Sequence, residues 1–163
     1  SKKFVKMSLS QTKKELLPDC ERCEALCCTV TKFTAGDYKK AAGVTCRNLD
    51  HKCFECKIYD TRQQLGYAFC LNFNCYGVGQ AVTALFNKLG YDCGNHNVHS
   101  RIRNDIFKYT YKFIRTKFPL GIVSSKNKIV DNGILLKFIV PIQLIPLVEE
   151  ATNILSEEIN EKL

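Results

Sequence analysis

Four cysteines stand within nine positions of the segment DCERCEALCC (19–28): Cys20, Cys23, Cys27 and Cys28. Clustered thiols serve as zinc ligands, as ligands of iron–sulfur clusters, as nucleophiles or as disulfide partners. In a helix, Cys20, Cys23 and Cys27 would share one face and converge on one ion, while Cys28 would lie about 100° further round. The adjacent pair therefore favours two metal ions, or one ion and a spare thiol.

Five more cysteines follow, so nine of the ten lie in the first half of the chain. They are Cys46, the C-x2-C pair Cys53 and Cys56, and the C-x4-C pair Cys70 and Cys75. A tetrahedral all-sulfur zinc site takes four thiolates at about 2.3 Å, and ligands far apart in sequence tie a fold together because each closes a loop. Eight or nine thiolates suit two such sites or one dinuclear site with a bridging sulfur.

Disulfides and iron ligation are the alternatives to zinc. Residues 1–20 lack the apolar core of a signal peptide, so we expect a cytoplasmic protein, in which thiols stay reduced. A disulfide between the neighbours Cys27 and Cys28 would also be strained. The C-x3-C-x2-C order of radical iron–sulfur enzymes does not occur in the chain. We therefore predict zinc, as two ions, with iron or an iron–sulfur cluster as the alternative.

The overall composition is that of one ordinary soluble domain, with 163 residues, 45% of them hydrophobic and 25% charged. The longest apolar run, 133–148, is too short to span a bilayer, so we expect no membrane partner. The net charge of +8 favours anionic partners. Eight thiolates holding two divalent ions would lower it to about +4, so charge alone is weak support for nucleic-acid binding.

The segment 19–28, together with AGVTCRNL (42–49), CKIYDTRQQLG (56–66) and FCLNFNCYGVGQAV (69–82), resembles the bacterial YkgJ-type family of zinc- or iron-chelating CxxCxxCC domains. The resemblance covers roughly residues 19–83 and is nearest to the cysteine domain found at the N-terminus of some pentapeptide-repeat proteins. It implies eight metal ligands and leaves Cys53 and Cys93 outside the pattern, as free or supporting thiols. The implied ligands are Cys20, Cys23, Cys27, Cys28, Cys46, Cys56, Cys70 and Cys75.

The pattern of apolar and turn residues predicts a mainly α fold. In this fold, we expect a metal-stabilised cysteine-rich subdomain with irregular loops to pack against two or three amphipathic helices. We expect an N-terminal extension (1–18), the cysteine-rich subdomain (19–80) and a helical subdomain (81–163), all in one globular unit. Asp19 is a candidate N-cap for the helix that carries the first cysteines. A second helix is expected over 56–67, ending at Gly66.

The segment 70–79 reads as a turn into a helix over 79–90, which Gly90 caps. Backbone N–H groups near Gly77 and Gly79 are candidate donors to cysteine sulfurs, although these glycines also suit a simple turn. The apolar face of the helix is expected to contain Val82, Leu85, Phe86 and Leu89.

The clearest helix is expected over 99–118, with a buried stripe of Ile102, Ile106, Tyr109 and Phe113. A second face of this helix is basic and is a candidate anion-binding surface, with Tyr111 placed to stack on a base. The ordinary alternative is a solvated face supported by Asp105. The basic residues are Arg101, Lys108, Lys112 and Arg115.

Residues 120–140 suggest a hairpin or an extended arm around DNG, and Pro141 and Pro146 are expected to break any helix. A last amphipathic helix is expected over 147–163. Its acidic side would lie against the basic helix, within the molecule or in a second copy.

A second candidate ligand set is Cys93, His96 and His99, in the order C-x2-H-x2-H. The alternative is a polar loop followed by a helix N-terminus. No Ser-His-Asp or Cys-His-Asn set, and no pair of carboxylates, stands out as catalytic.

The function that we expect is that of a non-catalytic metal-handling or interaction module, whose partners are metal ions and a protein or a second copy of the chain. Two alternatives stay open. One is an iron-binding redox protein or metal-dependent enzyme, and the other is a zinc-stabilised nucleic-acid-binding protein.

Overall fold

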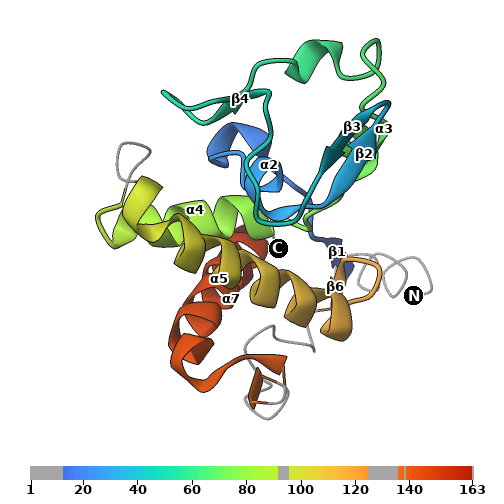
Figure 1. Ribbon diagram of the computed structural model, residues 1–163. Helices are drawn as coiled ribbons and strands as arrows, with labels where there is room; N and C mark the ends of the chain where they lie inside the picture. The colour runs from blue at the N-terminus through green and yellow to red at the C-terminus, as the bar shows by residue number, and fades with distance from the viewer. Residues whose placement is uncertain (1–12, 92–95, 125–135, 138, 163) are drawn as a thin grey trace, which may run out of the picture.

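The computed structural model describes residues 13–91, 96–124, 136–137 and 139–162. About half of the chain is helical, and the strands are short. Figure 1 shows the cysteine-rich segments above the long helices α4, α5 and α7. The expectation of a largely helical, cysteine-rich fold is therefore confirmed.

Three antiparallel two-stranded sheets join segments of the chain. Strand β1 (Lys13–Glu15) pairs with β6 (Ile122–Ser124). This pairing joins the segment that precedes the cysteines to the segment that follows α5. The other two sheets are local hairpins. They are β2 (Phe33–Ala35) with β3 (Tyr38–Lys40), and β4 (Leu49–Asp50) with β5 (Glu55–Cys56). Two-stranded ribbons of this length are marginal in water by themselves, so the packing around them must stabilise them.

The main hydrophobic core lies among α4 (Val78–Lys88), α5 (His96–Lys117) and α7 (Ile145–Lys162). Each helix contributes an apolar stripe at helical spacing, which is why the three pack together. The fully buried side chains are drawn from all three, and Leu26 of the cysteine-rich region joins them. They include Leu26, Val78, Val82, Ile106, Phe113, Ile114 and Val148.

A second, smaller core lies under the β2–β3 hairpin and contains Phe33, Ala35, Cys46 and Tyr67. A row of rings connects it to α5, and we call this row the aromatic ladder. Its ring centroids are separated by 5.4 Å, 5.5 Å and 5.6 Å in the order Phe33, Phe69, Phe73, Tyr111. The ladder therefore joins the cysteine-rich part of the molecule to the helical part.

The first cysteines do not lie on one helix, and that part of the prediction is wrong. A 3-10 turn, η1 (Cys20–Arg22), is followed by extended backbone at Cys23 and then by the short helix α2 (Cys27–Val30). Ala25 between them has a φ of 54°, which a continuous right-handed helix does not allow. Asp19 precedes η1 without capping it, because its carboxylate accepts a hydrogen bond from Nε of Arg22.

The expected helix over 56–67 is also wrong, since the segment forms one 3-10 turn, η2 (Tyr59–Thr61), and further turns. Gly66 does end it, with a φ of 82°. A short helix that was not expected, α3 (Ala68–Asn72), follows. Helix α4 lies close to its predicted range, but Leu89 is 48% exposed and does not belong to its buried face.

Helix α5 spans its predicted range and begins a few residues earlier, at His96. Its buried face is rotated from the predicted stripe. Ile102 is 42% exposed, whereas Arg103 is buried. The guanidinium of Arg103 pairs with the Glu24 carboxylate at 2.5 Å. This partner on the cysteine-rich segment compensates the charge of Arg103, which is buried between that segment and α5. Hydrophobic periodicity alone could not reveal that partner.

The last part of the chain contains a pairing that was not expected, since strand β6 pairs with β1. The DNG segment lies outside the described residues, so the hairpin or arm around it stays a prediction. Helix α7 begins at Ile145 after the 3-10 turn η4 (Ile142–Leu144), so Pro146 lies in its first turn. Proline is well tolerated there because the first N–H groups of a helix have no intrahelical acceptor.

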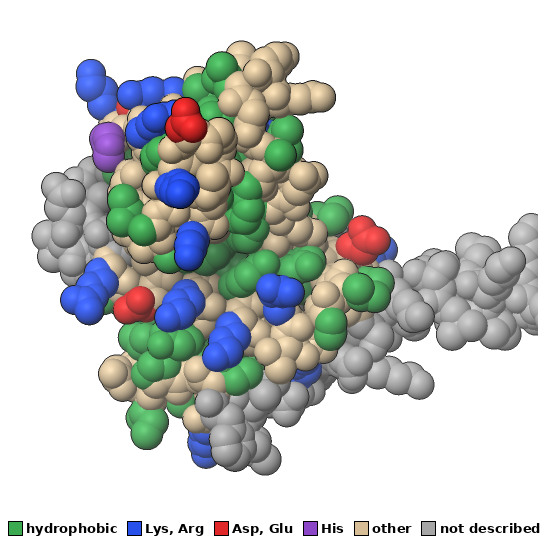
Figure 2. Space-filling model, turned by 45° about the vertical axis from the view of Figure 1, so that its right-hand side comes forward, with side chains coloured by type: hydrophobic (Ala, Val, Ile, Leu, Met, Phe, Trp, Pro, Cys, Tyr) green, Lys and Arg blue, Asp and Glu red, His purple; other side chains and the backbone are tan. Residues whose placement is uncertain are grey.

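The acidic side of α7 meets cations other than the basic residues of α5. Glu158 pairs with Arg22, and Glu150 pairs with Lys88 at 3.1 Å. The four candidate anion-binding residues of α5, Arg101, Lys108, Lys112 and Arg115, are all exposed. Figure 2 shows many basic and few acidic side chains on the face that it presents. In the described part of the chain, every helix is too short or too polar to cross a bilayer.

The rotation of α5 predicts opposite outcomes for two isoleucines one turn apart. Ile106→Ala removes a fully buried side chain and should lower the free energy of unfolding by about 2–5 kcal/mol. Ile102→Ala should lower it by less than about 1 kcal/mol. Urea unfolding of the reduced protein, followed by circular dichroism, measures both values. Equal losses would contradict the buried face assigned to α5.

Candidate metal centre

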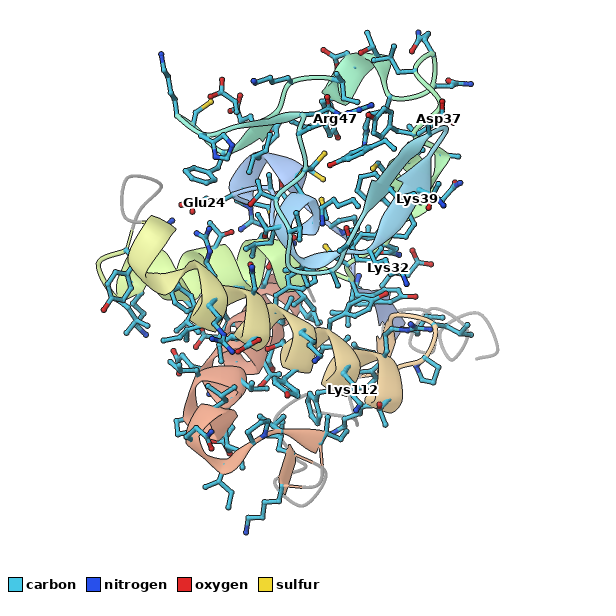
Figure 3. All side chains as sticks on the ribbon, in the orientation of Figure 1. Glu24, Lys32, Asp37, Lys39, Arg47 and Lys112 are labelled. Atoms are coloured by element: carbon cyan, nitrogen blue, oxygen red, sulfur yellow. The ribbon has the colours of Figure 1, made fainter. Side chains whose placement is uncertain are left out.

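Three thiols from two elements, α2 and β5, are in hydrogen-bonding contact at the start of α2. The Cys28 thiol donates to the sulfurs of Cys27 and Cys56, the latter at the end of β5. Adjacent residues on α2 therefore both face a strand that lies almost thirty residues further along the chain. Figure 3 shows several yellow sulfur atoms between α2 and the β2–β3 hairpin.

A second group of sulfurs gathers at the start of α4. The Cys23 and Cys75 sulfurs both lie beside Gly79, where an added Cβ would be 2.7 Å from Cys23 Sγ and 3.6 Å from Cys75 Sγ. Cys20 is close enough to act on the charge of Cys75, and Cys27 acts on both Cys23 and Cys75. Cys27 thus borders this group as well as the first one.

Cys46 and Cys70 complete the first group. Cys46 is buried in the smaller core, and Cys70 of α3 is partly buried against it. Cys70 interacts electrostatically with Cys27, Cys46 and Cys56. Pairwise electrostatic interactions therefore link the eight cysteines, with Cys20, Cys23 and Cys75 near the start of α4 and the others between α2 and the smaller core. Their role as metal ligands stays a prediction.

Backbone N–H groups point at four of these sulfurs. Cys23 accepts from the N–H of Leu26, Cys56 from Ile58, and Cys46 from Asn48 at 3.4 Å. Cys75 accepts from the N–H groups of Gly77 and Gly79, as the glycine-rich turn suggested. Hydrogen bonds to a charged group favour its charged form, so this backbone is arranged to support thiolates.

The pKa values of the thiols show that the site resists carrying charge by itself. Burial raises the pKa of Cys23 to about 12 and that of Cys70 to about 11. The hydrogen bonds that Cys28 donates raise its own pKa and lower that of Cys56 to about 6. Burial thus opposes charge at Cys23 and Cys70, whereas hydrogen bonding from Cys28 favours charge at Cys56. A bound divalent ion would displace the protons of its thiol ligands, because metals bind thiolates.

Lys40 is a site residue that the sequence analysis missed. It is only 3% exposed, and its ammonium donates to the carbonyls of Thr31 and Ala41. Burial lowers its pKa, while the nearby cysteines Cys46, Cys28, Cys27 and Cys70 oppose that shift. A buried ammonium is costly unless negative charge lies close to it. Side chains alternate between the two faces of a strand, so Lys40 lies on the same face of β3 as the half-buried Tyr38. This alternation is the one feature of the sequence that indicates burial of Lys40.

Arg62 supplies a second cation beside the first group of sulfurs. Its Nε donates to the carbonyl of Tyr59 at 2.8 Å and its Nη1 to the carbonyl of Cys70 at 3.1 Å. Its charge lowers the pKa values of Cys27, Cys56 and Cys70, although other causes are larger at each of them. Lys40 and Arg62 together make this group of sulfurs a cation-flanked site.

The remaining candidates lie elsewhere. Cys53 is exposed on the β4–β5 hairpin beside Asp50, apart from the sulfur groups. Cys93 lies outside the described residues, as do the side chains of His96 and His99, so the second ligand set stays a prediction. The ring of Tyr111 stacks within the molecule against Tyr76 and Phe107, each with its centroid 6.0 Å away.

The nine cysteines that the structure describes are all free thiols. Within the same residues, no group of three or more Cys, His, Asp or Glu side chains is placed to hold a metal ion. Cys27, Cys28 and Cys56 lie in hydrogen-bonding contact, and thiols are the donors of zinc and iron sites.

Comparison with known proteins finds one similarity. The chain is 30% identical over 74 residues to the uncharacterized protein YybG of Bacillus subtilis (strain 168). The match spans 44% of this chain and 26% of YybG, about a quarter of that protein. No family model and no solved structure matches the chain. The chain is thus similar, over part of its length, to a protein whose name states no function.

Proposed function

We propose that the protein is a non-catalytic metal-binding module of the YkgJ type, and that its eight clustered cysteines hold two zinc ions as thiolates. The partial similarity to YybG is compatible with this family assignment. The observation that carries the proposal is the set of interactions that joins Cys27 to Cys23, Cys28, Cys56, Cys70 and Cys75, which come from separate segments of the chain.

The two groups suggest how eight ligands divide between two ions. We assign Cys20, Cys23, Cys75 and Cys27 to the ion near Gly79, and Cys28, Cys46, Cys56 and Cys70 to the ion near Lys40. Each set then supplies the four thiolates of a structural zinc site. Cys27 touches both groups, so it is the residue best placed to bridge the ions.

Charge supports the same arrangement. Four thiolates around one divalent ion leave a net charge of about −2 at each site. Lys40 and Arg62 lie beside the group that contains Cys28, and backbone N–H groups of the first turn of α4 lie beside the other. Both sites thus have positive or partially positive neighbours, which a cluster of neutral thiols would not need.

Metal content tests the proposal directly. Protein purified under reducing conditions should contain about two zinc ions per chain and show no visible absorption. Removal of the metal by a chelator should loosen residues 19–80, because the binding energy of a structural zinc site is also folding energy. Elemental analysis, absorption spectroscopy and hydrogen exchange measure these results. A folded, reduced chain with no metal would refute the proposal, and coloured, iron-loaded protein would favour the redox alternative.

Gly79→Ala tests the closeness of α4 to the sulfurs. In an ordinary helix this change stabilises by about 0.5–1 kcal/mol. Here the new Cβ would lie 2.7 Å from Cys23 Sγ, so the sulfur must move, and we expect lower stability and reduced zinc content.

The matched control is Ala84→Gly at an exposed position of the same helix. It should lower stability by about 0.5–1 kcal/mol and leave the metal content unchanged. Stabilisation by Gly79→Ala with full metal content would contradict the site geometry.

Lys40→Met tests the role of the buried cation, with Lys39→Met as a neighbour that is exposed on the same strand. Loss of the Lys40 charge should weaken metal binding, because the thiolates lose a compensating charge, and zinc should pass to a competing chelator at lower chelator concentration. Lys39→Met should behave like the wild type. The zinc affinities of the three proteins are measured by competition with a chromophoric chelator. Equal affinities would show that Lys40 does not contribute to metal binding.

A further inference from the structure

One face of the molecule carries exposed cations that form no ion pair with the described residues. We define the basic band as Lys32, Lys108, Lys112 and Arg115, all of them exposed. The ion pairs within the described residues use other cations, namely Arg22, Lys88 and Arg103. The glutamates of α7 that form these pairs meet Arg22 and Lys88. The positive charge of the basic band is therefore available to a ligand or partner of opposite charge.

The band spans the junction between the two parts of the molecule. Lys32 directly precedes β2, whereas the other three cations lie on α5, and Figure 3 shows Lys32 and Lys112 on the two sides of this junction. The aromatic ladder crosses the same junction from Phe33 to Tyr111. The Arg115 guanidinium lies 5.6 Å from the Tyr111 ring, so one end of the ladder carries a band cation.

The ladder is only partly covered. Phe69, Phe73 and Tyr111 are neither fully buried nor fully exposed, and Figure 2 shows apolar surface beside basic side chains on this face. The faces of these rings are occupied by one another, so their edges are what a ligand would meet. A flat aromatic ligand with negative charge suits such a surface better than a purely aliphatic one.

We propose that the basic band and the edges of the aromatic ladder form a binding surface for single-stranded nucleic acid. Lysine and arginine contact the phosphates, which supply most of the sequence-independent affinity. Unpaired bases contact the edges of the ladder rings, where a duplex would present its backbone instead. The surface lies outside the sulfur groups, so binding does not require that the metal itself contact the nucleic acid.

The test is fluorescence anisotropy with labelled single-stranded and duplex oligonucleotides of about twenty nucleotides and no defined sequence, titrated with the full chain at several salt concentrations. We expect preference for the single strand and an affinity that falls steeply with salt. Lys112→Gln/Arg115→Gln should weaken binding about tenfold or more at 0.1 M salt and reduce the salt slope by about 1.4, since each phosphate contact on a single strand contributes roughly 0.7. Lys32→Gln should weaken it to a lesser degree.

The matched control is Lys52→Gln/Lys57→Gln, which removes the same charge from the turn and far end of the β4–β5 hairpin. This variant should bind like the wild type, and circular dichroism verifies that each variant folds. Equal weakening by both double variants would mean that only net charge matters, and it would overturn the proposal. So would the absence of binding, tighter binding to the duplex, or stronger binding to vesicles of anionic lipid.

Discussion

Electrostatics constrain the cysteine-rich part of the molecule, because several of its thiols are buried and interact with one another. Burial raises the pKa of several thiols, and hydrogen bonds among Cys27, Cys28 and Cys56 divide the remaining protons unevenly. Such a group is stable either as neutral thiols or as thiolates around cations, and intermediate states carry uncompensated buried charge. The buried ammonium of Lys40 and the backbone N–H groups directed at four sulfurs are arranged for the second state. The proposed zinc ions would complete it.

This constraint explains why the cysteine-rich part can consist of such short elements. Its strands have two or three residues, and its helices before α4 have five or fewer. Elements of this size bury too little apolar surface to hold one another in place. The smaller core contributes four buried residues and the aromatic ladder ties it to α5, but cross-links through metal would fix the loops between them. The helical part has its own continuous core and needs no such help.

The two proposed roles occupy different parts of one molecule. The sulfur groups lie between α2, the β2–β3 hairpin and the start of α4, whereas the basic band faces outward from α5 and the beginning of β2. Metal binding would order the hairpin that carries Lys32, and so it would also set the spacing between Lys32 and the cations of α5. A zinc-stabilised scaffold that presents a cationic surface is consistent with both sets of contacts.

Local sequence determined which residues gather and where the long helices run. The spacing of the cysteines indicated a shared site, and apolar periodicity located α4, α5 and the last helix to within a few residues. The glycines at 77 and 79 correctly suggested backbone donors to sulfur. These features depend on neighbours within a few positions, which a single chain displays directly.

Tertiary contacts decided the rest. The positive φ of Ala25 separates Cys23 from Cys27, the Glu24 partner draws Arg103 into the core, and the sulfurs around Lys40 make its burial tolerable. None of these partners lies on the same element as the residue it affects. Propensity and periodicity describe one element at a time, so they cannot register an interaction whose energy depends on a second segment. That is why the sequence alone pointed to the clustered cysteines but not to the cations that lie beside them.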